Sequence, residues 1–293
     1  MSVEDTAERI QSMEVRGALR IAVTAAEAML SEIMGGADIP SLERSAGVLK
    51  AARPSAVSLP NAVDYVLYLS RKHEDENTRI KRVEGFIESQ RKARQKIAEI
   101  GSHLIEEGDV LLTHCNSTAA TSVIKAAHSL GRKIRVFATE SRPRYQGHLT
   151  YKDLSKAGVD VTLIVDSAVN FTLHEKNIDK VIVGADTVYV NGDVINKIGT
   201  SQVALAAHVN DVDFMVATES IKFSPQSLLG IQTQIEERDP REVADFAEQV
   251  FNPAFDVTPK EHIHQIITEY GVIPPEAAYH ILKEHYSWRL EDG

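Results

Sequence analysis

The sequence predicts an α/β fold, with an N-terminal helical domain followed by a Rossmann-like domain that is built on a mainly parallel sheet. Residues 1–106 contain long segments whose apolar side chains recur at helical spacing. Residues 107–293 instead contain five short apolar runs that alternate with helical segments. Such alternation is typical of βαβ units, in which helices join parallel strands. We therefore expect two domains, with the boundary between residues 106 and 107.

Helices are expected in the first domain over residues 15–33, 57–69 and 84–105. The first of these carries Leu19 and Leu30 on one face, and the third is amphipathic and rich in Lys, Arg and Glu. These segments are long enough to form a helical core of their own.

Five strands are expected in the second domain, and the C-terminal residues 262–270 and 275–288 are expected to be helical. The predicted strands are Val110–Thr113, Ile134–Ala138, Val161–Val165, Val181–Val183 and Phe214–Ala217. In open parallel sheets, ligands bind beyond the carboxyl ends of the strands. The residues that follow each strand are therefore the first candidates for a functional site.

The stretch 180–202 brings several candidate groups together. Asp186 follows a buried strand, and Asn191-Gly192 predicts a tight hairpin turn. Lys197 closes the hairpin, and residues 199–201 then begin a helix. Helix N-termini bind phosphate well, because their free N–H groups and the helix dipole both favour an anion. We therefore expect an acid beside a phosphate-binding helix N-terminus.

Cys115 is the only cysteine, which excludes an internal disulfide and any zinc site with several cysteines. It precedes Asn116-Ser117-Thr118, a sequence that predicts an N-cap for the next helix. A helix N-terminus lowers the pKa of a nearby thiol, so Cys115 is a candidate thiolate base or nucleophile. The alternative is a small buried side chain without chemistry. Asp186 has the same two interpretations, as a protonated acid in apolar surroundings or as a turn residue.

The net charge of −10 argues against partners that bind through bulk positive charge, such as nucleic acid or an anionic membrane. An anionic substrate would need a local cluster of cations, for which Lys197, Lys222, Arg142 and Arg144 are candidates. No apolar run reaches the ~18 residues of a membrane span, and we expect a cytoplasmic location. No metal-ligand spacing, Walker sequence or GxGxxG loop is present, so no metal or cofactor is expected.

Seven motifs, taken together, resemble one family nearly along the whole chain. They are VRGALRIA (15–22), ARPSAVSLPNA (52–62), LLTHCNS (111–117), ESRPRYQG (140–147), VTLIVDSAV (161–169), VIVGADTVYVNGDVINKIGTSQ (181–202) and NPAFDVTP (252–259). The family contains ribose-1,5-bisphosphate isomerases, 5-methylthioribose-1-phosphate isomerases and the α, β and δ regulatory subunits of eukaryotic initiation factor 2B.

The resemblance implies an isomerase that converts ribose 1,5-bisphosphate to ribulose 1,5-bisphosphate in AMP breakdown. Cys115 would be the proton acceptor and Asp186 the proton donor; the presence of both favours an enzyme over a regulatory subunit. The motif at residues 52–62 is more similar to the bisphosphate enzymes than to the methylthioribose-phosphate enzymes. These two alternatives stay open from the sequence.

The resemblance also implies the residues that contact substrate. They are Arg16, Gly17, Ala18, Leu19, Arg53, Ser117, Thr118, Ala119, Gln146, Asn196, Lys197 and Lys222. It further implies a homo-oligomer, either a dimer or a hexamer, and AMP as an activator.

Overall fold

The computed structural model describes residues 2–73 and 75–291. Contacts divide the chain into two compact units. The helical unit comprises Met1–Ala93, Ile221–Phe223 and Lys283–Gly293, and the sheet unit comprises Arg94–Ser220 and Ser224–Leu282. The domain boundary expected between residues 106 and 107 stays a prediction.

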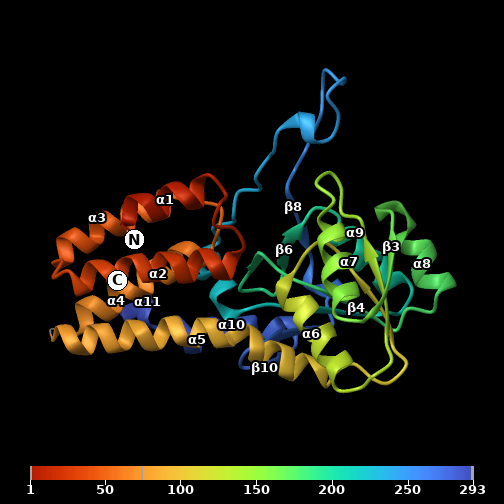
Figure 1. The fold of residues 1–293 in the computed structure, drawn as a ribbon, viewed down its shortest axis with the longest axis horizontal. Helices are drawn as coiled ribbons and strands as arrows, with labels where there is room; N and C mark the ends of the chain where they lie inside the picture. The colour runs from red at the N-terminus through yellow and green to blue at the C-terminus, as the bar shows by residue number, and fades with distance from the viewer. Residues whose placement is uncertain (1, 74, 292–293) are drawn as a thin grey trace. The chain divides into compact units, whose positions relative to one another are not determined.

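The helical unit contains four complete helices, most of a fifth, and two C-terminal pieces. They are α1 (Val3–Gln11), α2 (Ala18–Met34), α3 (Ile39–Ala52), α4 (Ser58–Lys72), the first part of α5 (Glu76–Ser102), the end of α10 (Ala278–His285) and α11 (Trp288–Glu291). Helix α2 packs against α4, and both α1 and α4 pack against α3 (Figure 1). The three helices expected here are confirmed as α2, α4 and α5. Helices α1 and α3 were not predicted, although Ser2 and Asp38 cap them through side-chain oxygens.

The sheet unit is built on a seven-stranded sheet in the order β10-β9-β7-β4-β1-β2-β3. Its strands are β1 (Val110–Thr113), β2 (Arg135–Thr139), β3 (Asp160–Ile164), β4 (Lys180–Val183), β7 (Asp213–Ala217), β9 (Gln265–Thr268) and β10 (Gly271–Ile273). All neighbours pair in parallel except β10, which is antiparallel to β9. The five predicted strands and the mainly parallel sheet are confirmed.

The helical segment expected over residues 262–270 is wrong. These residues contain β9, in which Ile266 and Ile267 are fully buried beside β7. A four-residue apolar run suits a buried strand or part of a helix equally well, and only the neighbouring strand decides between them. The helix expected over residues 275–288 is confirmed in part as α10.

The order of strands reverses between β1 and β4. From β1 the chain passes through α6 (Thr118–Ser129) to β2, and through α7 (Gln146–Lys156) to β3. It then returns through α8 (Val169–Glu175) to β4, on the other side of β1, and reaches β7 after α9 (Thr200–Val209). In doubly wound sheets, ligands bind at the carboxyl ends of the two strands that flank such a reversal.

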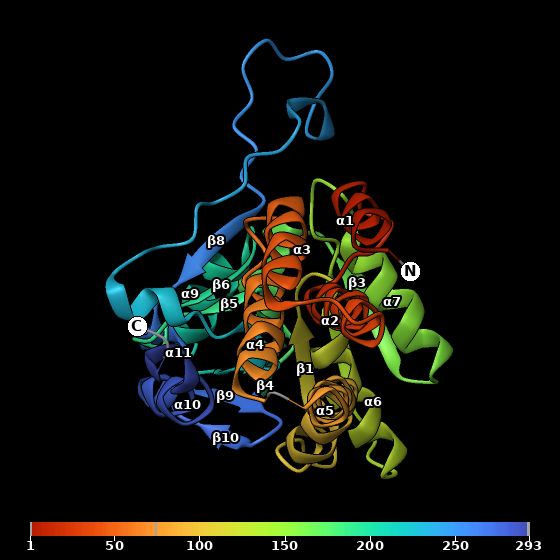
Figure 2. The ribbon, with the colours of Figure 1, turned by 90° about the vertical axis from the view of Figure 1, so that its left-hand side faces the viewer.

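A second, three-stranded antiparallel sheet follows β4, in the order β5-β6-β8 (Figure 2). Its strands are β5 (Thr187–Val188), β6 (Val194–Lys197) and β8 (Phe255–Thr258). The predicted hairpin is confirmed, and Gly192 takes the positive φ of 95° that its turn requires. Strand β8 was not predicted, because prolines lie at both ends of this segment and were interpreted as marking loops.

Residues 231–253 leave the sheet unit as a long arm before they return to β8 (Figure 1). The arm contains one short 3-10 helix, Pro240–Glu242. At its base, Glu237 bridges to Pro253, and the Ala254 N–H donates to the Glu236 carbonyl at 2.8 Å. The base of the arm is therefore a paired ribbon. None of the helices in the described part of the chain has the length and apolar character that a membrane span needs.

Candidate functional site

Cys115 lies just beyond the carboxyl end of β1, with its backbone held on both sides. Its N–H donates to Ser141 Oγ at 2.7 Å, and its carbonyl accepts from Thr150 Oγ1 at 2.8 Å. Its φ is 68°, and Ser141 and Tyr145 also have positive φ values. Non-glycine residues persist in this region only where their surroundings fix them, and they often cluster at functional sites.

The Cys115 side chain is buried, and its thiol contacts Gln146 Oε1 at 3.3 Å. Burial raises the pKa of Cys115 to about 12, while the positive charge of Lys197 lowers it and Asp186 raises it. This direction is opposite to the lowering of the pKa that a helix N-terminus would cause, and it favours the protonated thiol. Helix α6 begins only at Thr118, and the cost of burying a charge outweighs the favourable groups nearby.

Asp186 lies between β4 and β5, and its N–H donates to the Ile195 carbonyl at 2.9 Å. The negative charge of Asp186 raises the pKa of the Cys115 thiol, so the two side chains are close enough to interact electrostatically. Gly184 makes this approach possible because it has no side chain. A Cβ at this position would lie 2.2 Å from Ser117 Oγ and would clash with it. The exits of β1 and β4 therefore meet at the strand reversal.

Ser117 caps α6 as predicted, since its Oγ accepts from the Ala120 N–H at 3.2 Å. Thr118 is exposed at the first position of the helix. Ala119 is 1% exposed and belongs to the core, so only its backbone is placed to meet a ligand.

Lys197 ends β6 with its ammonium group beside β8. Nζ donates to the Ala254 carbonyl at 3.0 Å and lies 4.5 Å from the centre of the Phe255 ring. Its neighbour Asn196 is buried and donates through Nδ2 to Thr200 Oγ1 at 3.1 Å. Asn196 therefore fixes the turn from β6 into α9.

The phosphate site expected at residues 199–201 stays a prediction, and in the structure a carboxylate occupies this helix N-terminus. Asp256 accepts from the Gly199 N–H at 2.7 Å, and from the Ser201 N–H at 3.2 Å and its Oγ at 3.0 Å. Two of the N–H groups that a phosphate would need, those of Gly199 and Ser201, are therefore already bonded to Asp256 of β8.

Three residues support the site without being among the predicted substrate contacts, namely Ser141, Thr150 and Asp166. The Asp166 carboxylate accepts from the backbone N–H groups of Ser141 and Arg142 at 2.8 and 2.7 Å, and so fixes the loop that holds Cys115. Ser141 and Asp166 both follow predicted strands and so were among the first candidates at the strand ends, whereas Thr150 was not predicted.

His114 is held on both sides of its ring by groups of the sheet unit. Nε2 lies 2.9 Å from the Ile198 carbonyl and Nδ1 lies 2.7 Å from Thr139 Oγ1. The carbonyl can only accept, so Nε2 carries the hydrogen and Nδ1 accepts. Burial lowers the pKa of His114, which keeps the imidazole neutral.

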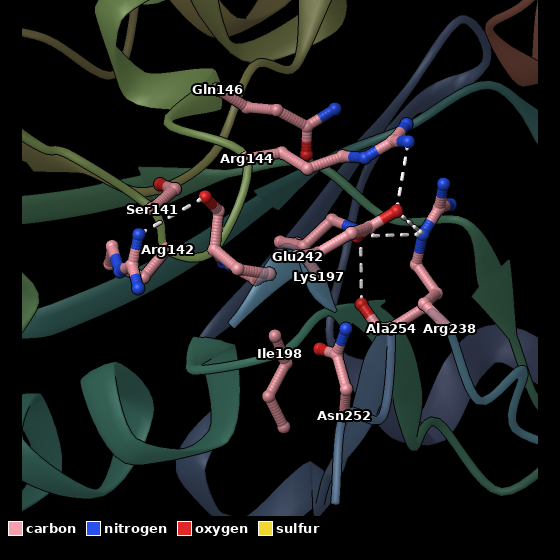
Figure 3. Close-up of a pocket in the computed structure, with 11 residues that line it drawn as sticks. Ser141, Arg142, Arg144, Gln146, Lys197, Ile198, Arg238, Glu242, Asn252 and Ala254 are labelled. Carbon is pink, nitrogen blue, oxygen red and sulfur yellow. Dashed lines mark hydrogen bonds and ion pairs between the residues drawn. The ribbon is translucent and has the colours of Figure 1, made fainter. Parts of the chain in front are cut away.

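A small pocket opens beside Gln146 and Lys197 (Figure 3). It is lined by Ser141, Arg142, Pro143, Arg144, Gln146, Lys197, Ile198, Arg238, Glu242, Asn252 and Ala254. Gln146 thus borders both the pocket and the Cys115 thiol. Arg142 and Arg144 were predicted as candidate cations, whereas Arg238 and Glu242 of the arm were not predicted.

The remaining predicted residues belong to the helical unit, and the structure brings several of them together there. Gly17 precedes α2 with a φ of 91°, and the Ala18 carbonyl accepts from Ser58 Oγ at 2.8 Å. Leu19 packs in a small cluster with Ile221, the neighbour of Lys222.

Asn61 holds the segment around Lys222 in place. Its Nδ2 donates to the carbonyls of Ile221 and Phe223 at 2.9 and 2.8 Å. Asn61 was not predicted, although it lies within one of the seven motifs.

The predicted residues fall into two groups. The sheet unit contains Cys115, Ser117, Thr118, Ala119, Gln146, Asp186, Asn196 and Lys197, and the helical unit contains Arg16, Gly17, Ala18, Leu19, Arg53 and Lys222. Among residues 2–73 and 75–291, no three His, Cys, Asp or Glu side chains gather as a metal site would require.

Comparison with known proteins gives matches over nearly the full chain. A model of the initiation factor 2 subunit family matches residues 14–275. A ribose 1,5-bisphosphate isomerase of Archaeoglobus fulgidus is 51% identical over 98% of this chain and 94% of its own. One of Methanocaldococcus jannaschii is 47% identical over 98% and 96%. A methylthioribose-1-phosphate isomerase of Desulforamulus reducens is 35% identical over 94% and 88%.

Solved structures share the fold. A translation initiation factor eIF-2B of Pyrococcus horikoshii has a TM-score of 0.79 and 29% identity, over 93% of this chain and 97% of its own. A tetrameric eIF2B-beta2-delta2 complex from C. thermophilum contains a chain with a TM-score of 0.76 over 97% of this chain and 94% of its own. At 21% identity, the second match shows the fold alone.

Proposed function

The chain belongs to the initiation factor 2 subunit family, and we propose that within this family it is an isomerase that converts α-D-ribose 1,5-bisphosphate to D-ribulose 1,5-bisphosphate. The observation that carries the proposal is the similarity to relatives of that name, which reaches 51% identity and extends over 98% of the chain. The thiol and the carboxyl group at the ends of β1 and β4 support the same conclusion, because aldose–ketose isomerisation needs an acid and a base.

The phosphate on C1 sets the chemistry, because it keeps the sugar ring from opening as a free sugar does. Asp186 is the proposed donor of a proton to the ring oxygen, which breaks the bond from that oxygen to C1. Cys115 is the proposed acceptor of the C2 proton, which it then delivers to C1. The 2-hydroxyl returns a proton to the Asp186 carboxylate as C2 becomes the ketone, so protons balance and no external oxidant is required.

This mechanism requires Cys115 to lose its own proton before it accepts one from C2. Burial raises its pKa to about 12, and Lys197 provides the positive charge that lowers it. Gln146 holds the thiol through a hydrogen bond and orients it. We propose that Gln146 and Lys197 contact substrate as well, together with Ser117, Thr118, Asn196 and the backbone of Ala119.

Residues of the helical unit complete the proposed set of substrate contacts. They are Arg16, Gly17, Ala18, Leu19, Arg53 and Lys222. Arg16 is exposed, and Gly17, which has no side chain, leaves space beside the backbone at the start of α2. Two arginines and a lysine suit a substrate that carries two phosphates.

Phosphorus NMR of the purified chain with ribose 1,5-bisphosphate tests the proposal. We expect the anomeric phosphate signal to disappear and ribulose bisphosphate to form. Cys115→Ser and Asp186→Asn should each lower turnover by more than about a hundredfold while the far-ultraviolet circular dichroism spectrum stays unchanged. Asp193→Asn, in the same hairpin as Asp186, is the matched control and should retain activity. Full activity of either site variant would refute its role.

The same experiment with methylthioribose 1-phosphate separates the two isomerase activities. If the chain converts that substrate alone, it is a methylthioribose-1-phosphate isomerase instead. A folded chain that is silent with both substrates would instead favour a regulatory subunit.

We further infer that the substrate arises from nucleotide breakdown in the cytoplasm, that AMP activates the enzyme, and that the chain forms a homo-oligomer. Light scattering would distinguish a dimer from a hexamer. Added AMP should raise the initial rate; an unchanged rate would remove the activator from the proposal.

A further inference from the structure

The pocket beside Gln146 concentrates positive charge within an acidic chain. Its lining contains four cationic side chains, Arg142, Arg144, Lys197 and Arg238, and a single carboxylate, Glu242. The lining therefore has a net charge of four minus one, or +3, in a chain whose net charge is −10. Such a local excess attracts and retains anions.

Glu242 bridges two of these guanidinium groups (Figure 3). Its Oε1 lies 2.8 Å from Arg144 Nη2, and its Oε2 lies 3.2 Å from Arg238 Nε. A single anionic group that accepts from two arginine forks is the arrangement in which proteins also hold phosphate.

The position of Arg238 is set before any ligand arrives. Its side chain is 12% exposed, and its backbone N–H donates to the backbone carbonyl of the buried Asn252 at 2.9 Å. Glu236, outside the lining, lies 3.3 Å from Arg238 Nη1 and further orients the fork. Arg144, by contrast, has a side chain that is 46% exposed and can turn toward a ligand.

We propose that this pocket binds a phosphate group through Arg144 and Arg238, and that Glu242 occupies the same place when no ligand is bound. A phosphate monoester carries up to two negative charges and more acceptor oxygens than a carboxylate, so it matches the cationic lining better than Glu242 does. The choice of phosphate over other dianions rests on the proposed function, whose substrate carries two phosphates.

Binding would release Glu242, and with it the contact of the arm to the 141–146 loop. Besides the ion pair of Arg144 with Glu242, that contact includes Arg142 Nη2, which donates to the Val243 carbonyl at 3.2 Å. The arm therefore acts as an internal competitor that an incoming phosphate displaces.

Calorimetric titration of inorganic phosphate into the full chain, at constant ionic strength and without substrate, tests the site. Glu242→Gln removes the competing charge and should tighten phosphate binding about tenfold. Arg144→Gln should weaken it by a similar factor and should cancel the gain when combined with Glu242→Gln. Arg241→Gln is the matched control, because Arg241 is on the same 3-10 helix but pairs with Asp239 instead of Glu242.

An affinity that is unchanged by both Glu242→Gln and Arg144→Gln would overturn the proposal. Arg144 is partly exposed, so its variant avoids the risk of misfolding that a variant of the half-buried Arg238 would carry. Because the titration contains no sugar, it gives an answer even if the chain does not turn over ribose 1,5-bisphosphate.

Kinetics then distinguish the two sources of the phosphate. If the pocket holds a phosphate of the substrate, inorganic phosphate should inhibit competitively and Arg144→Gln should raise KM. If it holds a separate phosphorylated effector, phosphate should change the rate without competition, and Arg144→Gln should remove that effect.

Discussion

The Sγ atom of Cys115 lies 3.3 Å from Oε1 of Gln146, and the thiol donates its hydrogen to this amide oxygen. An amide oxygen can only accept, so the contact favours the protonated thiol over the thiolate. Burial acts in the same direction. The ligand-free site therefore holds a proton on the residue that is proposed to accept one, and a change in its surroundings has to precede catalysis.

The state of Cys115 can be measured directly, because it is the only cysteine in the chain. Its pKa is raised from 9 to about 12, which lowers the thiolate fraction near pH 8 by on the order of a thousandfold. Iodoacetamide should therefore react far more slowly with the folded chain than with the same chain in urea. The rate at which iodoacetamide modifies the folded chain should still rise with pH above 10. A plateau below pH 8 in the folded chain would show a thiolate and contradict this prediction.

Much of the sheet was predictable, because parallel strands that are buried on both faces appear as short apolar runs. Val181–Val183 and Phe214–Ala217 are such runs, and Asn191-Gly192 marked the hairpin through local turn chemistry alone. Strand β8 could not be predicted in this way. It pairs with β6, about sixty residues earlier, and no local sequence pattern indicates that pairing.

The residues of the candidate site divide in the same way, into those that a sequence pattern identifies and those that contacts between distant segments place. Cys115 and Asp186 were identifiable because they follow predicted strands, and the family motifs added Gln146 and Lys197. Asp256, which fills the N-terminus of α9, comes from a distant strand. The pairing of Glu242 with Arg144 likewise joins residues that are nearly one hundred positions apart. Contacts between distant segments of this kind decide whether a helix N-terminus or an arginine is available to a ligand.

The neutral state of His114 predicts a loss of stability in acid. Burial lowers its pKa in the folded chain, so the unfolded chain takes up a proton first as the pH falls through about 6.5. The free energy of unfolding should therefore decrease from pH 7 to pH 5. His114→Gln should remove part of this dependence, as measured by urea unfolding at each pH. His174→Gln, an exposed histidine on α8, is the control and should leave the pH profile unchanged. Identical profiles for the chain and His114→Gln would contradict the assignment.

Asp256 stabilises the start of α9 rather than leaving it open for phosphate. Asp256→Ala removes the acceptor of two N–H groups and one hydroxyl, and it should lower the free energy of unfolding by about 1–3 kcal/mol. Asp256→Asn retains one acceptor oxygen and should cost less. Urea unfolding measures both, and Asp239→Ala, which removes the exposed cap of the 3-10 helix in the arm, should have no measurable effect. Unchanged stability of Asp256→Ala would contradict the role of Asp256 as a cap.

Gly184 lets the ends of β1 and β4 approach, and this approach can be tested by adding a single methyl group. In Gly184→Ala, the new Cβ would lie 2.2 Å from Ser117 Oγ and 2.5 Å from its Cβ. Ser117 would have to move and would lose its bond to the Ala120 N–H, so we expect a loss of about 1–3 kcal/mol in unfolding free energy. Isomerase turnover should fall as well, because Cys115 and Asp186 flank the disturbed contact.

Two variants make this last test specific. Gly85→Ala lies inside α5 with nothing within 4 Å of the new Cβ, and it should stabilise the chain by about 0.5–1 kcal/mol through helix propensity. Ser117→Gly removes the side chain that the new methyl group would strike, so combining it with Gly184→Ala should recover stability that Gly184→Ala alone loses. Recovery in the double variant would identify the contact of Gly184 with Ser117 as the cause. A double variant that is as unstable as the sum of the two single changes would show that Gly184 is needed for a different reason.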